Sequence, residues 1–234
     1  MLPVSAVLVD FDGTACASDV AELLLRVFGD PSWPEYDDAV DRHEIGLREA
    51  IQAQDGLLEA TKDELVAYAV KHCPLDPTFP PFVAWLTASG IPLALVSDGF
   101  GFYIRPILEA AGLGSLTVIA NEQVWGPDGR PGGMRFVNRH EVCMGCGTCK
   151  MNAVLRYREA YGPVAFIGDG QSDRYGAIYA DMTFAKGELV DHCLRDGVPF
   201  VPWNDFDQVR RSLETTSAPP GPVAPTTCPG WTTA

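Results

Sequence analysis

Positive charge is scarce in this sequence. Its 234 residues include 17 lysines and arginines against 31 aspartates and glutamates, which gives a formal net charge of −14. Nucleic acids and anionic lipid surfaces are bound through clustered basic side chains, so this deficit argues against both. No apolar stretch approaches the roughly 20 residues that a membrane-spanning helix needs. We therefore expect neither nucleic acid nor a membrane as a partner.

The sequence also lacks a basic leader and a paired set of cysteines. Its first apolar run is short and ends in aspartates, so we interpret it as a core strand and not as a signal peptide. The cysteine count is seven, an odd number, and three cysteines are crowded into the segment CMGCGTC. A secreted disulfide framework would need pairs, so the expected location is the reducing cytoplasm.

What the sequence does have is an alternation of strand and helix patterns. Continuous apolar runs of strand length occur at 4–9, 92–96, 116–120 and 164–167, with a weaker one at 181–186. Helical patterns lie at 21–28, 82–89, 103–111, 151–161 and 172–180. Buried strands that alternate with helices indicate a parallel sheet covered on both faces. We predict an α/β fold with a Rossmann-like parallel sheet and helices on both of its faces.

Residues 16–81 depart from this alternation, because they are helical in pattern and contain no obvious strand. We predict that they form a small inserted helical cap over a catalytic core made of residues 1–15 and 82–214. Residues 121–137 contain a Pro-Asp-Gly turn between short extended pieces, which predicts a β-hairpin. Residues 215–234 are rich in proline and threonine without an apolar period, and we expect a disordered tail there.

Polar clusters follow three of the predicted strands: DFDGT, SDGF and GDGQSD. Ligands bind beyond the carboxyl ends of parallel strands, so these clusters should converge. Asp10 and Asp12 point to one side of their strand, and two like charges so close need a cation or a proton between them. A carboxylate can attack a phosphoryl group, and a second one can handle the proton. Mg²⁺ would relieve the repulsion, with Asp169 and Asp173 as further carboxylates.

A bound phosphate also needs hydrogen-bond donors and a positive side chain. The Ser97 hydroxyl and the backbone N–H groups from Ser97 to Gly99, which we expect to open a helix, can donate to phosphate oxygens. Lys150 is the candidate for the positive charge, since it begins a predicted helix, where a cation opposes the helix dipole unless it has an anionic partner.

DFDGT, VSDGF, Lys150 and GDGQSD, in this order, resemble the four motifs of the haloacid dehalogenase superfamily of phosphatases. The resemblance implies that Asp10 is the nucleophile and Asp12 the general acid and base. It also implies that Ser97 binds the phosphoryl group and that Lys150 orients the nucleophile Asp10 and the phosphate. Mg²⁺ would then be held by Asp10, Asp12 (through its carbonyl), Asp169 and Asp173.

Within the superfamily, the sequence resembles the phosphoserine-phosphatase-like branch with a helical cap. It is most similar to the 2-hydroxy-3-keto-5-methylthiopentenyl-1-phosphate phosphatases of methionine salvage. Asp19 matches an acid that faces the substrate in that branch. Asp98 replaces the commoner glycine and adds a negative charge near the phosphate. Arg48, in the cap, could pair with an anionic group of the substrate; the alternative is a helix-surface arginine near Glu44 and Glu49.

The expected function is that of a Mg²⁺-dependent phosphomonoesterase, which hydrolyses a small phosphorylated metabolite through an aspartyl-phosphate. Alternatives are a phosphoserine phosphatase, a phosphoethanolamine/phosphocholine-type phosphatase, and a phosphotransferase of the same fold. From a different class, an inactive metal-binding module is also considered. The oligomeric state has no signal in the sequence.

The segment HEVCMGCGTCK remains outside this scheme. His140, Cys143, Cys146 and Cys149 recur every three residues. Thiolates at such gaps, with histidine as a fourth ligand, can hold a structural Zn²⁺. Redox chemistry at the Cys-x-x-Cys spacing and buried cysteines without a ligand are the other interpretations. Any zinc here would be separate from the Mg²⁺ and would help fix where the helix of Lys150 begins.

Overall fold

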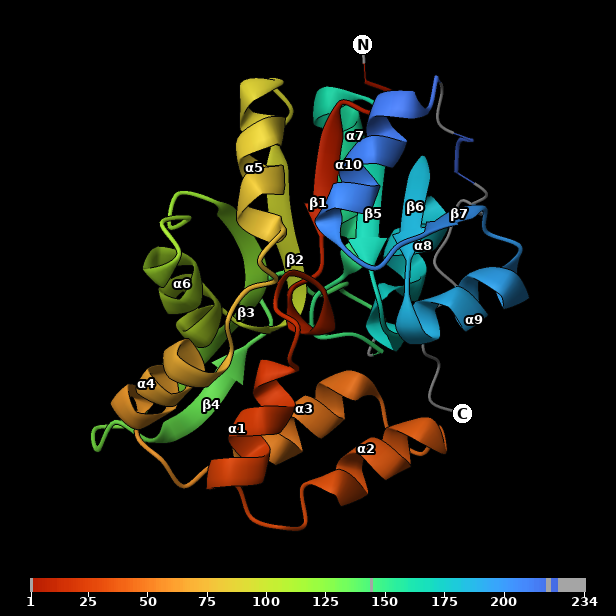
Figure 1. Ribbon diagram of the computed structural model, residues 1–234. Helices are drawn as coiled ribbons and strands as arrows, with labels where there is room; N and C mark the ends of the chain where they lie inside the picture. Colours follow the sequence, from red (N-terminus) through yellow and green to blue (C-terminus); the bar gives the residue numbers. More distant parts are fainter. Residues whose placement is uncertain (1, 144, 218–219, 223–234) are drawn as a thin grey trace.

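The structure is a computed structural model, and it describes residues 2–143, 145–217 and 220–222. One sheet runs in the strand order β4-β3-β2-β1-β5-β6-β7 (Figure 1). The strands are β1 Ala6–Val9, β2 Leu93–Phe100, β3 Thr117–Trp125, β4 Pro131–Arg135, β5 Val164–Gly168, β6 Met182–Ala185 and β7 Phe200–Pro202. Neighbouring strands are parallel except for β3 and β4, which are antiparallel. The predicted parallel α/β sheet is therefore confirmed.

Helices cover both faces of the sheet. On β1, Val7 and Val9 belong to one buried layer and Ala6 and Leu8 to the other, and all four are 0% exposed. The first layer contains α5 Phe79–Ala88, α6 Gly101–Ala110 and α10 Phe206–Thr215, and the second contains α7 Lys150–Tyr161, α8 Arg174–Tyr179 and α9 Gly187–Asp196. Because both faces are buried, the strand is a continuous apolar run, the pattern from which it was predicted.

The chain between β1 and α5 is helical, as expected for residues 16–81. It contains η1 Phe11–Ala15, α1 Val20–Phe28, α2 Pro34–Asp41, α3 Leu47–Asp55 and α4 Lys62–His72. In Figure 1, α1, α2 and α3 lie below the carboxyl ends of the strands, over the edge where the polar clusters emerge. Helix α4 instead packs against α6, at the side of the sheet. The division into core and cap at these exact boundaries stays a prediction.

Four details of the sequence-based prediction can be compared with the structure. The hairpin predicted at 121–137 is present as the β3–β4 pair. The segment SDGF lies in an irregular end of β2, and α6 begins only at Gly101, so the expectation that SDGF opens a helix was wrong. Strand β7 was not predicted. The expected tail, 215–234, falls mostly outside the described residues.

None of the helices in the described part of the chain has both the length and the apolarity that crossing a membrane requires.

Candidate active site

Asp10 and Lys150 form a buried ion pair at the carboxyl edge of β1. Lys150 Nζ donates to Asp10 Oδ1 at 2.7 Å, to Asp173 Oδ1 at 2.6 Å and to Ser172 Oγ at 2.9 Å. The side chain of Lys150 is 1% exposed and that of Asp10 is 7% exposed. Burial lowers the pKa of Lys150, but the charges of Asp10 and Asp173 outweigh it, and the net pKa is well above the usual value. The ammonium therefore stays charged at neutral pH.

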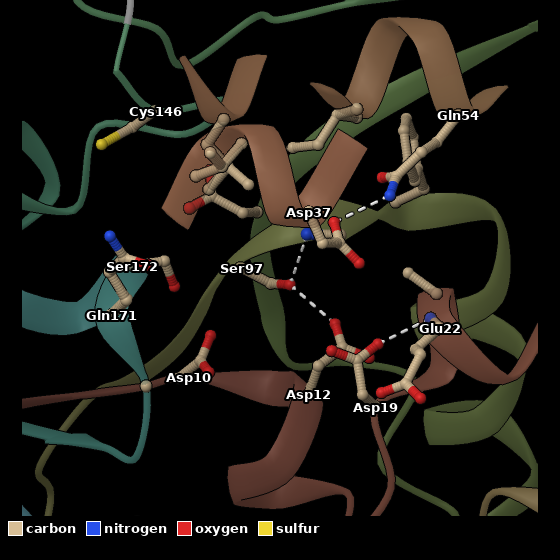
Figure 2. Close-up of a pocket in the computed structure, with 18 of the residues that line it drawn as sticks. Asp10, Asp12, Asp19, Glu22, Asp37, Gln54, Ser97, Cys146, Gln171 and Ser172 are labelled. Carbon is tan, nitrogen blue, oxygen red and sulfur yellow. Dashed lines mark hydrogen bonds between the residues drawn. The ribbon is translucent and has the colours of Figure 1, made fainter. Parts of the chain in front are cut away.

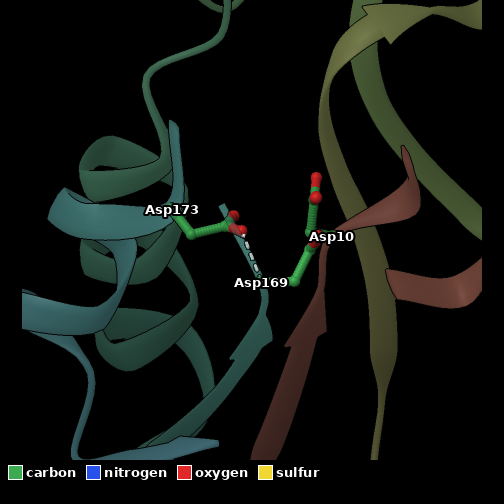
Figure 3. Close-up of side chains that lie close together, drawn as sticks. All are labelled: Asp10, Asp169 and Asp173. Atoms are coloured by element: carbon green, nitrogen blue, oxygen red, sulfur yellow. Dashed lines mark hydrogen bonds between the residues drawn. The ribbon is translucent and has the colours of Figure 1, made fainter. Parts of the chain in front are cut away.

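Three carboxylates meet beside this ammonium. Asp10, Asp169 and Asp173 offer oxygens that all lie within 4.8 Å of one another (Figure 3). Burial raises the pKa of Asp10 and of Asp169, and the charge of Asp173 raises both further. Lys150 lowers the pKa of both aspartates, but by less than burial and Asp173 raise it, so the net pKa of each is raised. Like charges this close in a buried site favour a further cation.

Two glycines allow the carboxylates to come this close. Gly13 has a φ of +73°, and a Cβ there would overlap the Asp169 carboxylate. A Cβ on Gly168 would overlap the Asp173 carboxyl group in the same way. Because neither glycine has a side chain, the carboxylate oxygens can approach one another. A set of ligands made only of oxygen atoms suits a hard cation such as Mg²⁺.

Asp12 lies at the same edge of the sheet as Asp10, and three hydrogen-bond donors surround its carboxylate. Its Oδ1 accepts from the backbone N–H of Val20 at 2.9 Å, and its Oδ2 accepts from Tyr103 Oη at 3.0 Å and Ser97 Oγ at 3.2 Å. These bonds favour the charged form. Burial, and after it the charge of Asp19, outweigh them and raise the pKa of Asp12 to about 7. A carboxyl group with that pKa can both give and take a proton near neutral pH.

Ser97 and its neighbours form the end of β2 facing Asp12 (Figure 2). Besides donating to Asp12, Ser97 Oγ accepts from the Gly99 N–H at 2.8 Å. Asp98 is directed elsewhere: its Oδ1 accepts from the backbone N–H of Thr148 at 2.5 Å. The extra negative charge predicted near the phosphate is thus hydrogen-bonded to the segment that leads into Lys150.

These groups line one cavity of about 440 Å³. Asp10, Asp12, Asp169, Ser97, Asp98 and Gly99 lie on the sheet side of it. Helices α1, α2 and α3 supply the opposite wall. Figure 2 shows Asp37 and Gln54 on that wall, away from Asp10. The cavity is large enough for a small ester, with a charged edge at one side and a helical wall at the other.

The two predicted substrate contacts outside the sheet have different surroundings. Asp19 lines the cavity and also caps α1, since its Oδ1 accepts from the backbone N–H of Glu22 at 2.8 Å. Arg48 is not among the lining residues. It is 3% exposed, and its guanidinium donates to the backbone carbonyls of Cys143 and Cys146 at 2.9–3.1 Å.

The four residues predicted to bind zinc are near one another but do not converge as ligands. They all line a small cavity of about 10 Å³ beside Lys150. His140 Nδ1 accepts from the backbone N–H groups of Val142 and Cys143, at 3.2 and 3.1 Å. Within the described residues, the carboxylate trio is the group of potential metal ligands whose atoms lie within 4.8 Å of one another.

Three polar contacts at this edge escaped the sequence analysis. Thr14 Oγ1 donates to Asp169 Oδ1 at 2.5 Å, Tyr103 donates to Asp12, and Ser172 accepts from Lys150. Thr14 and Ser172 lie inside the motifs DFDGT and GDGQSD, so their place in the site could have been predicted from the sequence. Tyr103 belongs to an ordinary amphipathic helix and carried none.

Known proteins resemble this chain over most of its length. A phosphatase of Bacillus velezensis named 2-hydroxy-3-keto-5-methylthiopentenyl-1-phosphate phosphatase is 27% identical over 220 residues, which is 89% of this chain and 89% of the relative. The Geobacillus kaustophilus protein of the same name is 29% identical over 212 residues, which is 88% of this chain and 93% of the relative. A solved phosphoserine phosphatase, captured with an analogue of its phospho-aspartyl intermediate, has the same fold. It superimposes with a TM-score of 0.69 at 17% identity, covering 90% of this chain and 99% of its own.

The family to which the motifs point is found independently. The haloacid dehalogenase-like hydrolase family matches residues 7–177, which run from β1 to α8 and include all four motifs. That match and the shared fold confirm the resemblance stated from the sequence. This chain belongs to the haloacid dehalogenase-like hydrolases.

Proposed function

We propose that this hydrolase is a Mg²⁺-dependent phosphomonoesterase, which cleaves a small phosphorylated metabolite through an aspartyl-phosphate. The observation that carries the proposal is the buried ion pair of Asp10 and Lys150, in which Asp10 lines the cavity and Lys150 lies behind it. Lys150 holds Oδ1 of Asp10 and favours the charged form against the burial that opposes it. A carboxylate fixed in this way can act as a nucleophile.

Each side chain has a defined part in the two steps. Asp10 Oδ2, the oxygen that Lys150 does not hold, bonds to phosphorus while the bond from phosphorus to the ester oxygen breaks. Asp12 gives its proton to the departing oxygen. Asp12 then takes a proton from water, whose oxygen bonds to phosphorus as the Asp10–phosphorus bond breaks. Ser97 and the nearby backbone N–H groups bind the phosphoryl oxygens. One water is consumed, and both aspartates return to their starting state.

The carboxylate trio supplies the metal site of this proposal. Asp10 and Asp169 would hold Mg²⁺ directly, with the Asp12 carbonyl as a further ligand. Asp173 would assist, because its Oδ1 already accepts from Lys150 and its Oδ2 from the backbone N–H of Asp169 at 2.9 Å. When bound, the cation offsets the charge of the phosphoryl oxygens and of the carboxylates around them.

Phosphate release with Mg²⁺ tests this function directly. The panel should contain p-nitrophenyl phosphate, phosphoserine, 2-aminoethyl phosphate and the ester named for the curated relatives. Asp10→Asn should abolish turnover, because an amide cannot attack phosphorus, while Asp38→Asn, on the exposed side of α2, should match the wild type. Wild-type release by Asp10→Asn would exclude the nucleophile assignment. Full activity in protein shown to be metal-free by elemental analysis would exclude the metal.

Water as the acceptor separates a phosphatase from a phosphotransferase of the same fold. In the presence of a small alcohol, a phosphatase releases one phosphate for each ester consumed. A phosphotransferase instead gives a new ester and less free phosphate.

A structural zinc at His140, Cys143, Cys146 and Cys149 is a separate proposal. It is supported by their common position around one small cavity beside Lys150 and by the preference of Zn²⁺ for thiolates. It requires their ligand atoms to move together, because no three of them lie within 4.8 Å of one another in the structure. Elemental analysis of protein purified without added metal should then give up to about one zinc per chain. The cytoplasmic location, and the expectation that neither nucleic acid nor membrane is a partner, likewise stay predictions.

A further inference from the structure

Tyr103 is a buried side chain at the reacting edge to which the two steps described above give no part. It lies in the first turn of α6, lines the cavity and is only 1% exposed. Its hydroxyl donates to Asp12 Oδ2 at 3.0 Å. A tyrosine hydroxyl ordinarily loses its proton only near pH 10, so at neutral pH it is a hydrogen-bond donor. Tyr103 thus holds one oxygen of the carboxyl group that must give and take protons.

Aromatic neighbours fix the ring that carries this hydroxyl. The centroid of the Tyr103 ring lies 5.2 Å from that of Phe102, in an edge-to-face arrangement, and 6.5 Å from that of Phe100. It lies 6.3 Å from the ring of Phe11, the residue between the two aspartates of the motif DFDGT. Rings packed in this way have little freedom to turn. The hydroxyl is therefore held at a defined place relative to Asp12.

Gly99 leaves the space in which the two side chains meet. A Cβ at this position would overlap the Tyr103 hydroxyl, and it would lie 2.7 Å from Asp12 Oδ2. Any larger residue at position 99 would therefore push the hydroxyl away from the carboxyl group. The end of β2, the first turn of α6 and the aspartate after β1 fit together at this point only because residue 99 has no side chain.

The other side chain that donates to Asp12 Oδ2 is needed elsewhere during the reaction. Ser97 Oγ donates to this oxygen at 3.2 Å (Figure 2). A serine hydroxyl has one proton, so when Ser97 donates to a phosphoryl oxygen, as proposed above, it no longer donates to Asp12. Among the described side chains, Tyr103 is then the donor that remains on Oδ2, while the backbone N–H of Val20 stays on Oδ1.

We propose that Tyr103 is a positioning residue for Asp12, which holds the carboxyl group in place when Ser97 turns to the phosphoryl oxygens. The inference rests on the proposed phosphatase activity and adds a residue from outside the four motifs to the same site. In the first step the Asp12 carboxyl group gives its proton to the ester oxygen as the bond from phosphorus to that oxygen breaks. The carboxylate that is left accepts a hydrogen bond from Tyr103, which keeps its own proton throughout.

Tyr103→Phe tests this role, because it removes the hydroxyl and keeps the ring. With Mg²⁺ present, kcat/KM is measured for n-butyl phosphate, whose departing oxygen needs a proton, and for p-nitrophenyl phosphate, whose departing oxygen does not. The alkyl ester should lose about tenfold or more, as expected for one hydrogen bond to a charged group, and the aryl ester should change little. Because kcat/KM covers the steps up to departure of the alcohol, the later attack by water does not affect the comparison.

Tyr157→Phe is the matched control. It also removes the hydroxyl of a partly buried tyrosine, but this hydroxyl is bonded to the Thr117 side chain, in the layer on the other face of the sheet, and Tyr157 does not line the cavity. Its alkyl-to-aryl ratio of kcat/KM should equal that of the wild type. Both esters are measured on one preparation, so a smaller folded fraction cancels in the ratio. Tyr103→Met, which also lacks the donor, is the second variant if Tyr103→Phe does not fold.

Inhibition by inorganic phosphate separates the part of Tyr103 from that of Ser97. Ser97→Ala should raise the inhibition constant of phosphate by about tenfold, because it removes a donor to the phosphoryl oxygens. Tyr103→Phe should leave this constant unchanged, because the partner of its hydroxyl is Asp12. An equal rise in both variants would mean that Tyr103 binds the phosphate itself, and the positioning role would be wrong.

The outcomes also separate this inference from the function on which it rests. If the wild-type protein does not hydrolyse p-nitrophenyl phosphate at all, the phosphatase proposal fails and this inference falls with it. If the wild type hydrolyses both esters, but Tyr103→Phe lowers kcat/KM for both by the same factor or for neither, the inference alone is overturned.

Discussion

Replacing Lys150 by methionine should destabilise the protein, and the deficit should grow with pH. The side chain keeps its length but loses the ammonium, which donates to Asp10 at 2.7 Å and to Asp173 at 2.6 Å in a site where all three side chains are at most 7% exposed. Removing one partner of a buried pair leaves an uncompensated charge and costs about 3–5 kcal/mol. Here two carboxylates lose the same partner, so the upper end of that range is expected near neutral pH.

The pH dependence follows from the direction of the pKa shifts. The pKa of Asp10 is already raised, first by burial and then by Asp173, and Lys150 lowers it. Without Lys150 it rises further. A carboxyl group whose pKa is higher in the folded than in the unfolded protein binds more protons when folded. Stability is therefore lost as pH rises from the unfolded value towards the folded one, by about 1.4 kcal/mol for each unit of added shift.

Urea unfolding of metal-free protein, at about pH 5, 6.5 and 8, measures this effect. The Lys150→Met deficit relative to the wild type should be smallest at the lowest pH. Ser172→Ala is the matched control, because it removes one neutral partner of the same ammonium; it should cost about 0.5–1.5 kcal/mol with little pH dependence. A Lys150→Met deficit that is small at pH 8, or that does not change with pH, would refute the idea that charged carboxylates depend on this lysine.

Three further predictions concern the same edge. Hydrolysis of an alkyl phosphate should decline as pH rises through about 7, because Asp12 must be protonated to act as the acid, and Asp19→Asn should move this decline to lower pH; identical kcat/KM profiles for alkyl and aryl esters would contradict it. Arg48→Ala should lower the free energy of unfolding by about 1–3 kcal/mol, since it strips donors from partly buried carbonyls, and an unchanged thermal midpoint would show that the contact is absent in solution. Changing Cys143 and Cys146 together to serine should lower both stability and turnover without altering the Mg²⁺ concentration required; a stable and fully active double variant would leave these cysteines without a role.

Much of the fold could be predicted because buried parallel strands have a distinctive sequence. The run at Ala6–Val9 is apolar at every position, and it is buried on both faces of the sheet. Strand β7, Phe200–Pro202, is three residues long and only partly buried, too short for a period to show. The irregular end of β2 depends on pairing with β3, which local sequence does not encode.

The candidate site was predictable where residue type and motif order carry the chemistry, as for Asp10, Asp12 and Lys150. It was not predictable where tertiary placement decides the partner. Arg48 was a plausible substrate contact, yet it is directed at carbonyls almost a hundred residues away, with separations of 95 and 98. Tyr103 belongs to no motif, and only the folded chain places its hydroxyl 3.0 Å from Asp12.

The reacting edge is assembled from parts of the chain that meet only when folding is nearly complete. Lys150 and Asp10 are separated by 140 residues, Thr14 and Asp169 by 155, and Tyr103 and Asp12 by 91. Contacts between distant parts of a chain close slowly, because ordering the long loops between them costs entropy before the contacts form. In a refolding experiment, helical signal should therefore return before activity. A fragment that stops before α7 would lack both Lys150 and Asp169, so we expect no such fragment to be a catalyst.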